Sequence, residues 1–321
     1  MSPTESKRPD DVAQMVHAIV VTWQGAHLLS PCLRALEAEA RRLPADRLSI
    51  TVVDNASTDG TTALLTREFP GATCIPLSEN LGFGRGCNAG LRRALDANAD
   101  FALLVNNDVE LEPGCVASLL AAARAHPEAG LLTGTLLFKD EEVVNSTGLV
   151  FDALGRVRDR DFRLPLARLE RPDGPVAGVS GGLSLLRCSM LRRIGGFDPD
   201  YFAYYEDADL SLRAAHAGWL CWYVAAARAR HRFSATFGRG SARQRFLLGR
   251  GHLRTLAKHQ PPLRSAALVP LTAAWRVFAK APLELFRRRP ALAAAELQAA
   301  LAGVGSALSA WAARVRKRLR T

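Results

Sequence analysis

The stretch "LSITVVDNASTDGT", residues 48–61, joins an apolar, β-branched run to a turn of Asn, Ser, Asp and Gly. Such a run is typical of a buried strand, and the residues after it are typical of turns. The earlier run "VHAIVVTW" (16–23) has the same character. Between them, "GAHLLSPCLRALEAEARRL" (25–43) repeats leucines at helical spacing. Strand, helix and strand in this order predict a βαβ unit.

The same alternation continues to residue 111. Helical patterns over 62–69 and 84–98 alternate with strand patterns over 72–77 and 100–111. This order predicts an α/β fold, a Rossmann-like α/β/α sandwich with a mostly parallel central sheet. Right-handed crossovers place the loops after the strands at one edge of the sheet, where ligands bind in such folds.

Polar side chains follow each of the four predicted strands. They are Thr22 and Trp23, then Asp54, Asn55 and Ser57, then Asn80, Gly82 and Arg85, and finally Asn106, Asn107 and Asp108. Because these strand ends share one edge of the sheet, we expect the side chains to gather around one ligand.

Residues 130–199 are less regular. We predict strands over 130–138 and 144–155, a mobile charged loop over 156–175, and a strand that leads into a short helix over 176–199.

The 321-residue chain is 48% hydrophobic and 23% charged, which suits a globular protein with a sizeable core. Its six cysteines are scattered without a C-x-x-C spacing, which favours a reducing compartment over a disulfide framework or a zinc ribbon. Residues 1–14 are polar and lack the apolar core of a signal peptide, so we expect a disordered N-terminus.

Charge divides the chain into two parts. Residues 1–227 contain 22 lysines and arginines against 29 acids, whereas residues 228–321 contain 20 lysines and arginines and only two acids. We therefore expect a globular domain over 15–240 and a basic, amphipathic helical region over 241–321. Such a region seeks polyanions.

An anionic membrane surface is the polyanion we favour. The apolar stretch before Arg314 contains Glu296 and falls short of the ~20 solidly apolar residues of a membrane span, so a surface helix fits better. No nucleic-acid-reading motif accompanies the cations, and we therefore expect no nucleic-acid partner. A solvated edge of a helical bundle is the remaining interpretation. The aromatic residues among the cations are Trp275, Phe278, Phe286 and Trp311.

Four segments taken together resemble the inverting glycosyltransferases of family 2, which have the GT-A fold. The resemblance is to the bacterial rhamnosyltransferase-like branch that builds O-antigens and other surface polysaccharides, and it covers roughly residues 16–240. Each segment alone is weak, but their order and spacing fit jointly. The segments are "VVTWQG" (20–25), "VVDNASTDGT" (52–61), "ENLGFGRGCNAG" (79–90) with "LLVNNDVEL" (103–111), and "GGFDPDYFAYYEDADLSLRAAHAG" (195–218) followed by "ARARH" (227–231).

The resemblance implies a nucleotide-sugar site at the sheet edge. Asp54 would accept a hydrogen bond from the base or the ribose, although a cap for its own turn is the simpler interpretation from the residues alone. Arg85 would pair with a phosphate or stack on the base, with a solvated arginine as the alternative. The other residues of this site would be Thr22, Asn80, Gly82 and Asn107.

The resemblance also implies a divalent metal ion, Mg²⁺ or Mn²⁺. The segment "VNNDV" (105–109) stands where the family has its D-x-D motif, with Asn106 in place of the first acid. Asp108 would supply a hard oxygen ligand and His231 an imidazole ligand. The alternatives are a strand-end turn for Asp108 and a structural role for His231.

In the family, the acid pair within "YYEDAD" (204–209) lies beneath the acceptor sugar. Asp207 would be the general base, kept ionised by the helix dipole, and Glu206 would bind acceptor hydroxyls. Asp209 would be a first-turn cap. The alternative is that all three acids only favour a helix start. The expected wall for sugar rings is Tyr201, Phe202, Tyr204 and Tyr205.

These implications combine into a metal-dependent, inverting glycosyltransferase. It would transfer a sugar, with dTDP-L-rhamnose as the expected donor, to a hydroxyl of a surface glycan or polyprenyl-linked saccharide. Its expected location is the cytoplasmic face of the cell membrane. One alternative is a sugar-nucleotide nucleotidyltransferase, but "VTWQGAHLL" (21–29) lacks the Gly-rich phosphate loop which that class needs. The other is a non-catalytic membrane-associated scaffold, against which the intact "EDAD" and "NND" segments argue.

Overall fold

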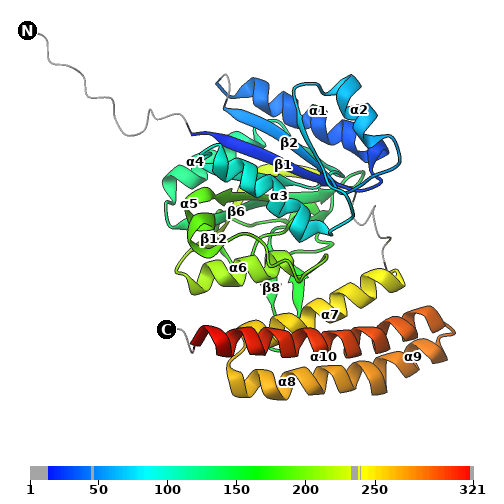
Figure 1. The fold of residues 1–321 in the computed structure, drawn as a ribbon. Coiled ribbons are helices and arrows are strands. Elements are labelled where there is room, and N and C mark those ends of the chain that lie inside the picture. The colour runs from blue at the N-terminus through cyan, green and yellow to red at the C-terminus, as the bar shows by residue number, and fades with distance from the viewer. Residues whose placement is uncertain (1–13, 45–46, 233–237, 239, 319–321) are drawn as a thin grey trace, which may run out of the picture.

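The computed structural model describes residues 14–44, 47–232, 238 and 240–318. Apart from Gln14, the N-terminal segment predicted to be disordered lies outside the described residues. Figure 1 shows a sheet covered by helices on both faces, with a separate layer of helices formed by the C-terminal residues.

The first half of the chain forms the parallel part of the sheet, in the order β3–β2–β1–β4. Thr22 lies opposite Asp54 in the register of β1 and β2, so their carboxyl ends meet as predicted. The bounds are β1 (Val16–Thr22), β2 (Leu48–Asp54), β3 (Thr73–Pro76) and β4 (Phe101–Val105).

The second half extends the same sheet. β11 (Leu183–Arg187) pairs antiparallel with both β4 and β6 (Ala129–Phe138), and β12 (Leu220–His231) then pairs parallel with β6. Six of the eight strands on the main path run in one direction, which confirms the mostly parallel sheet. The short strands β5 (Val109–Leu111), β7 (Val144–Ser146) and β10 (Gly174–Val176) pair at its edge.

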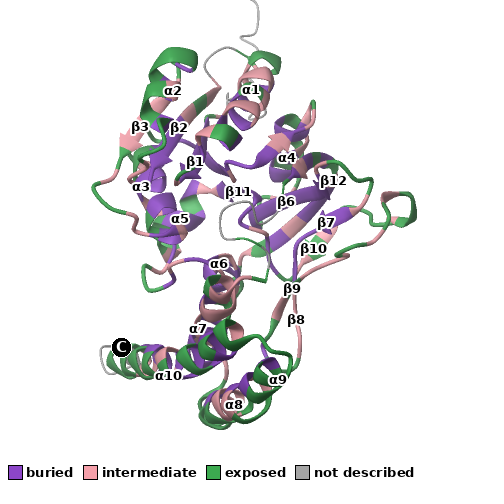
Figure 2. Ribbon diagram, turned by 90° about the vertical axis from the view of Figure 1, so that its right-hand side faces the viewer, coloured by how far each residue is buried: buried purple, intermediate pink, exposed green. Residues whose placement is uncertain are grey.

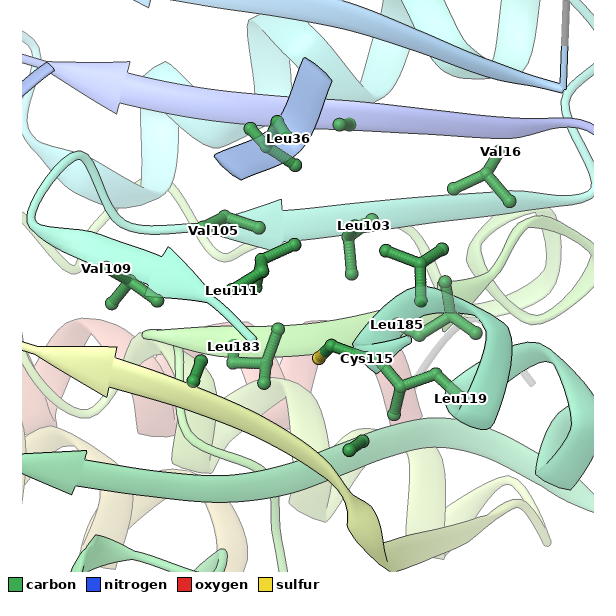
Figure 3. Packing of buried hydrophobic residues seen from close by; sticks show 14 of the residues in the cluster. Val16, Leu36, Leu103, Val105, Val109, Leu111, Cys115, Leu119, Leu183 and Leu185 are labelled. Atoms are coloured by element: carbon green, nitrogen blue, oxygen red, sulfur yellow. The ribbon is translucent and has the colours of Figure 1, made fainter. Parts of the chain in front are cut away.

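Two apolar layers hold this sandwich together, because alternate side chains of a strand point to opposite faces. In β1, Val20 packs into the core of one face and Ile19 into the core of the other. Figure 3 shows the first core, where Leu36 of α1 and Leu119 of α4 meet strand residues such as Leu103. The helices of this face are α1 (Ala26–Arg42), α2 (Thr61–Glu68) and α4 (Cys115–Ala125), and those of the other are α3 (Phe83–Asp96), α5 (Cys188–Ile194) and α6 (Glu206–His216).

The predicted loop over 156–175 is structured. It contributes β9 (Val157–Asp159), which pairs antiparallel with β8 (Leu149–Phe151), and the short helix η2 (Leu166–Arg168). Asp152 closes the hairpin turn by accepting the N–H groups of Leu154 and Arg156. The many charges of residues 156–175 favoured the prediction of a loop. In the structure several of these side chains form ion pairs, as Arg156 does with Asp152 across the hairpin turn.

The C-terminal residues form a helical bundle instead of a single amphipathic helix. Its small core contains Leu253, Leu256 and Val269, with Ala307 contributed by the last helix. Figure 2 shows the bundle beneath the sheet, with much of its outer surface exposed. The helices are α7 (Ala242–His259), α8 (Pro262–Trp275), the π-helical η3 (Arg276–Lys280), α9 (Ala281–Phe286) and α10 (Pro290–Arg318).

One helix of the described residues, Pro290–Arg316, is long and apolar enough to cross a membrane by length and composition. This corrects the expectation that the stretch falls short of a span. However, 44% of its most apolar window is buried within the protein. Glu296 on this helix is fully buried and pairs with Arg276 and Arg245. In this structure the helix therefore packs as the central helix of the bundle.

Candidate active site

A cavity of about 290 Å³ opens at the carboxyl edge of the sheet. The loops after β1, β3 and β4, the start of α6, the β8–β9 hairpin and Leu248 of α7 all line it. Ten of the twelve residues predicted for the site are in its wall: Thr22, Asn80, Gly82, Asn107, Asp108, Tyr204, Tyr205, Glu206, Asp207 and His231. Segments that are far apart in the chain therefore meet here as the sequence predicts.

Asp54 and Arg85 are the two exceptions. The Asp54 carboxylate is buried behind the cavity wall and accepts hydrogen bonds from the Ser57 N–H (3.0 Å) and the Thr62 hydroxyl (3.2 Å). This is the geometry of the turn-cap interpretation. The Arg85 Nε donates to the carbonyl of Pro199 (2.9 Å) outside the cavity. Of the strand-end side chains expected to gather around one ligand, Asp54 and Arg85 therefore lie outside the cavity wall.

The sheet-edge loops are held together by short polar contacts. Asn107 Nδ2 donates to the Thr22 hydroxyl (2.9 Å), which ties the loop after β4 to the end of β1. Asn55 Nδ2 donates to the Gly82 carbonyl (3.0 Å). Gly82 has a φ of +83°, and a Cβ atom there would lie 2.3 Å from the Phe202 carbonyl oxygen. Only glycine allows the α3 loop to approach the segment before α6 this closely.

Asp108 and His231 lie side by side at the cavity wall. The turn after β4 presents Asp108, and His231 is the last residue of β12; their Oδ1 and Nε2 atoms are 3.2 Å apart. His231 Nδ1 is 2.9 Å from Asn145 Oδ1; because an amide oxygen only accepts, Nδ1 donates to Asn145 and Nε2 is the ring nitrogen that faces Asp108. Two acceptor atoms at this distance need a cation or a proton between them.

This donor set fits a divalent cation such as Mn²⁺, which accepts both carboxylate and imidazole ligands. Among the residues that the structure describes, no group of three His, Cys, Asp or Glu side chains completes a metal site. A cation held by Asp108 and His231 would therefore take its remaining ligands from water and from the diphosphate of a bound substrate.

Asp207 and Glu206 begin α6 and line the same cavity. The two residues before them, Tyr204 and Tyr205, have φ values of +65° and +74°, a backbone conformation that is costly for tyrosine and typical of functional sites. Asp207 Oδ2 accepts the Gly181 N–H (3.0 Å) and Oδ1 accepts the Ala208 N–H (2.7 Å). The Glu206 Oε2 is buried and has no hydrogen-bond partner among the described residues.

The two acids differ in how their charges are stabilised. Burial, reinforced by the negative charge of Asp207, raises the pKa of Glu206 well above its ordinary value. Burial also raises the pKa of Asp207, against the opposing effect of the N–H groups of Gly181 and Ala208. Desolvation thus opposes the helix dipole, which is expected to keep Asp207 ionised, while the backbone donors favour the ionised form. Because Asp207 accepts the N–H groups of Gly181 and Ala208, whereas the backbone donor of Glu206 is its own N–H, the negative charge of the pair belongs on Asp207 and the proton on Glu206.

Two neighbours of this pair are structural. Tyr201, expected in the sugar-binding wall, is fully buried and hydrogen-bonded to Thr255 of α7 (2.8 Å). Asp209, expected as a first-turn cap, is buried and accepts Lys258 Nζ and His259 Nε2 of α7, both at 2.7 Å. Because α7 holds both residues, the C-terminal bundle stabilises the segment that presents the acid pair.

The residues of the cavity wall that the sequence did not indicate include Asn145, Arg158 and Asp159. Asn145 lies in β7 and orients His231, while its Nδ2 is buried without a partner among the described residues. Arg158 and Asp159 lie on β9. No sequence motif surrounds Arg158 and Asp159, so only the tertiary structure shows that they line the cavity.

Residues 13–247 match the family model described as "Glycosyltransferase like family 2". The chain belongs to glycosyltransferase family 2. The match extends into α7, in keeping with the contacts of α7 to the acid-pair segment. The family 2 assignment agrees with the GT-A-like sandwich and with the resemblance seen in the sequence, and makes this protein a glycosyltransferase.

Relatives of this family 2 enzyme include N-acetylglucosaminyl-diphospho-decaprenol L-rhamnosyltransferase from Mycobacterium tuberculosis. It is 31% identical over 250 residues, which span 72% of this chain and 80% of the relative. Two solved structures share the fold. Mannosyltransferase PcManGT from Pyrobaculum calidifontis, in complex with GDP-Man and Mn²⁺, has a TM-score of 0.58 at 19% identity, covering 94% of this chain and 90% of its own. GalNAc-T7 with UDP, GalNAc and Mn²⁺ has a TM-score of 0.61 at 14% identity, covering 78% and 48%.

Proposed function

We propose that this enzyme transfers L-rhamnose from dTDP-L-rhamnose, with inversion, to a hydroxyl of a polyprenyl-diphosphate-linked saccharide. The observation that carries the proposal is that Asp207 faces the same cavity as the Asp108–His231 pair. Inverting transfer needs a base on one side of the anomeric carbon and a charge-stabilising group at the leaving diphosphate on the other. The named activity of the mycobacterial relative supports the choice of donor and acceptor.

Each residue has a defined task in this proposal. Asp207 accepts the proton of the acceptor hydroxyl as its oxygen attacks the anomeric carbon, and its two backbone donors keep the carboxylate in place. Protonated Glu206 donates a hydrogen bond to the acceptor. Asp108 and His231 hold a divalent cation, which supplies Lewis-acid stabilisation of the leaving diphosphate. Thr22, Asn80, Gly82 and Asn107 line the nucleotide-sugar side.

The alternatives from the sequence are weaker against this site. A nucleotidyltransferase needs a Gly-rich phosphate loop after the first strand, whereas α1 follows β1 through "WQG" (23–25). A non-catalytic scaffold has no use for a buried acid pair that faces a cavity, since such a pair is costly. Asp54 stays a prediction as a base-binding residue and Arg85 as a phosphate-binding residue.

The proposed reaction is tested by a panel of dTDP-, UDP- and GDP-sugars with Mn²⁺ and N-acetylglucosaminyl-diphospho-farnesol as acceptor. We expect release of dTDP together with a product that is larger by one rhamnosyl residue, and little release from the UDP- and GDP-sugars. Mass spectrometry of the lipid product and quantitation of free nucleotide measure both. Transfer from a UDP- or GDP-sugar alone would refute the proposed donor while leaving the family assignment intact.

We also propose that the outer face of the C-terminal bundle binds the anionic cytoplasmic surface of the cell membrane. The bundle exposes large apolar side chains and the cations Arg287, Arg288 and Arg289, whereas both of its acids are buried. An exposed surface that combines apolar side chains with positive charges suits anionic lipid. The apolar residues are Leu263, Leu271, Trp275, Phe278, Leu285, Phe286 and Leu301.

Changing Phe278 and Phe286 together to serine should weaken vesicle binding by about tenfold, because both rings are at least 80% exposed and would lose their insertion into lipid. Co-sedimentation with phosphatidylglycerol-containing vesicles measures this. The control is serine at Met15 and Leu220, which are exposed on the sheet domain and should leave binding unchanged. Equal binding by wild type to neutral and anionic vesicles, or preferential binding to RNA, would contradict the proposal.

A further inference from the structure

We propose that the β8–β9 hairpin recognises the acceptor, with Arg158 binding a phosphate of a diphosphate-linked acceptor and Asp159 binding a hydroxyl of its sugar. The inference rests on the proposed function and identifies the acceptor side of the same cavity. Leu149, Val157, Arg158 and Asp159 of the hairpin line the cavity together with the acid pair. Figure 2 shows the hairpin between the central sheet and the C-terminal helices.

The hairpin is held in a fixed position relative to the acid pair. The Val157 N–H donates to the hydroxyl of Tyr205, the residue directly before Glu206 (3.4 Å). At the tip, the Leu154 carbonyl accepts His252 of α7 (3.0 Å). These contacts join the hairpin, α7 and the start of α6 into one wall. A ligand that touches the hairpin is therefore positioned relative to Asp207.

Asp159 is a half-buried acid that lines the cavity. Burial and the negative charge of Asp207 raise its pKa to about 6. Glu206 also faces the cavity with a buried, unpartnered Oε2. Polar atoms are rarely left unpaired in a protein interior, and sugar hydroxyls are partners of the right kind for both.

Arg158 differs from the arginines around it. Arg156, Arg160, Arg163 and Arg171 each pair with an acid, whereas Arg158 is exposed at the cavity and has no ion pair among the described residues. A guanidinium group binds phosphate oxygens in a bidentate manner. In a sugar diphosphate the phosphate is one ring away from the attacking hydroxyl. Arg158 on the hairpin and Asp207 on α6 line one cavity, so a single bound acceptor can contact both.

Both the donor and the proposed acceptor contain a diphosphate, so Arg158 must be assigned to one of the two. Asp108 and His231 would hold the donor diphosphate through a divalent cation, and they lie at the ends of β4 and β12. Arg158 lies instead on the hairpin that is tied to Tyr205 and α7. We therefore assign Arg158 to the acceptor.

The test compares two acceptors, N-acetylglucosaminyl-diphospho-farnesol and the phosphate-free octyl N-acetylglucosaminide, in the wild type, Arg158→Gln and Asp159→Asn. We expect Arg158→Gln to raise the KM of the diphosphate acceptor by about 10- to 100-fold and to leave the KM of the octyl glycoside unchanged. Asp159→Asn should raise the KM of both acceptors. Arg156→Gln, a matched variant on the same hairpin whose arginine pairs with Asp152, should behave like wild type.

Each other outcome overturns the inference in a recognisable way. An unchanged acceptor KM in Arg158→Gln, with active wild type, refutes the hairpin assignment but not the proposed function. A raised KM for the donor alone would assign Arg158 to the leaving diphosphate. If the wild type transfers to neither acceptor while still binding dTDP with Mn²⁺ in a thermal-shift assay, the proposed acceptor class is wrong. Arg158 is exposed, so its variant should retain the wild-type melting temperature.

Discussion

Replacing Asp207 by asparagine is expected to lower turnover by about 1000-fold or more while leaving donor binding unchanged. Asparagine has the same shape but cannot accept a proton from the acceptor hydroxyl. Its amide would still accept the Gly181 N–H, so the start of α6 should keep its position. Turnover is measured by nucleotide release, and donor binding by the thermal shift with dTDP and Mn²⁺.

The pH dependence of kcat/KM is a second test of Asp207 as the general base. Asp207 works only when deprotonated, and burial raises its pKa above that of an ordinary aspartate. Wild-type kcat/KM should therefore fall on acidification, beginning at a higher pH than for a solvent-exposed aspartate, and should level off above that pKa. The small residual activity of Asp207→Asn should lack this acid limb.

Asp200→Asn is the matched control for Asp207→Asn. Asp200 lies in the same segment but is half-exposed and pairs with Arg254 outside the cavity, so its loss should leave turnover within about twofold of wild type. Substantial activity in Asp207→Asn, with the control also active, would rule out Asp207 as the base and point to Asp159 or Glu206.

Replacing Asp108 by asparagine should lower activity on the order of 1000-fold and should also abolish detectable binding of Mn²⁺. The change removes the negative charge 3.2 Å from His231 Nε2 while keeping the size of the side chain. Titration of Mn²⁺ by electron paramagnetic resonance, with dTDP present, measures metal affinity independently of turnover. EDTA treatment of the wild type should remove activity, and Mn²⁺ should restore it.

Glu110→Gln is the control for Asp108→Asn. Glu110 is two residues further along, in β5, and pairs with Lys139 away from the cavity. The Glu110→Gln variant should bind Mn²⁺ as tightly as the wild type. Unaltered Mn²⁺ affinity in Asp108→Asn would remove this carboxylate from the metal site, whatever happened to its activity.

The fold and most of the site could be read from local patterns. The β-branched runs ending in polar residues predicted where β1 and β2 end, because strand periodicity and turn chemistry depend on near neighbours in the chain. The strand predicted over 100–111 is instead two strands, β4 and β5, separated by the turn that contains Asp108. Because the carboxyl ends of parallel strands lie at one edge of the sheet, Thr22, Asn107 and Asp108 were predicted to lie together. The pair Glu206–Asp207 was visible because its charges are unusual beside aromatic residues.

Long-range packing set the rest. Asp54 is an exception, because it accepts the nearby Ser57 N–H and Thr62 hydroxyl, as its local turn chemistry indicated. Three contacts of the site join residues at least 48 positions apart in the chain. They are the contact of the β8–β9 hairpin with Tyr205, that of Asn145 with His231, and that of Asp209 with α7. Such pairings depend on how the loops and the bundle pack onto the sheet, and no local propensity encodes which distant partner a buried charge will meet.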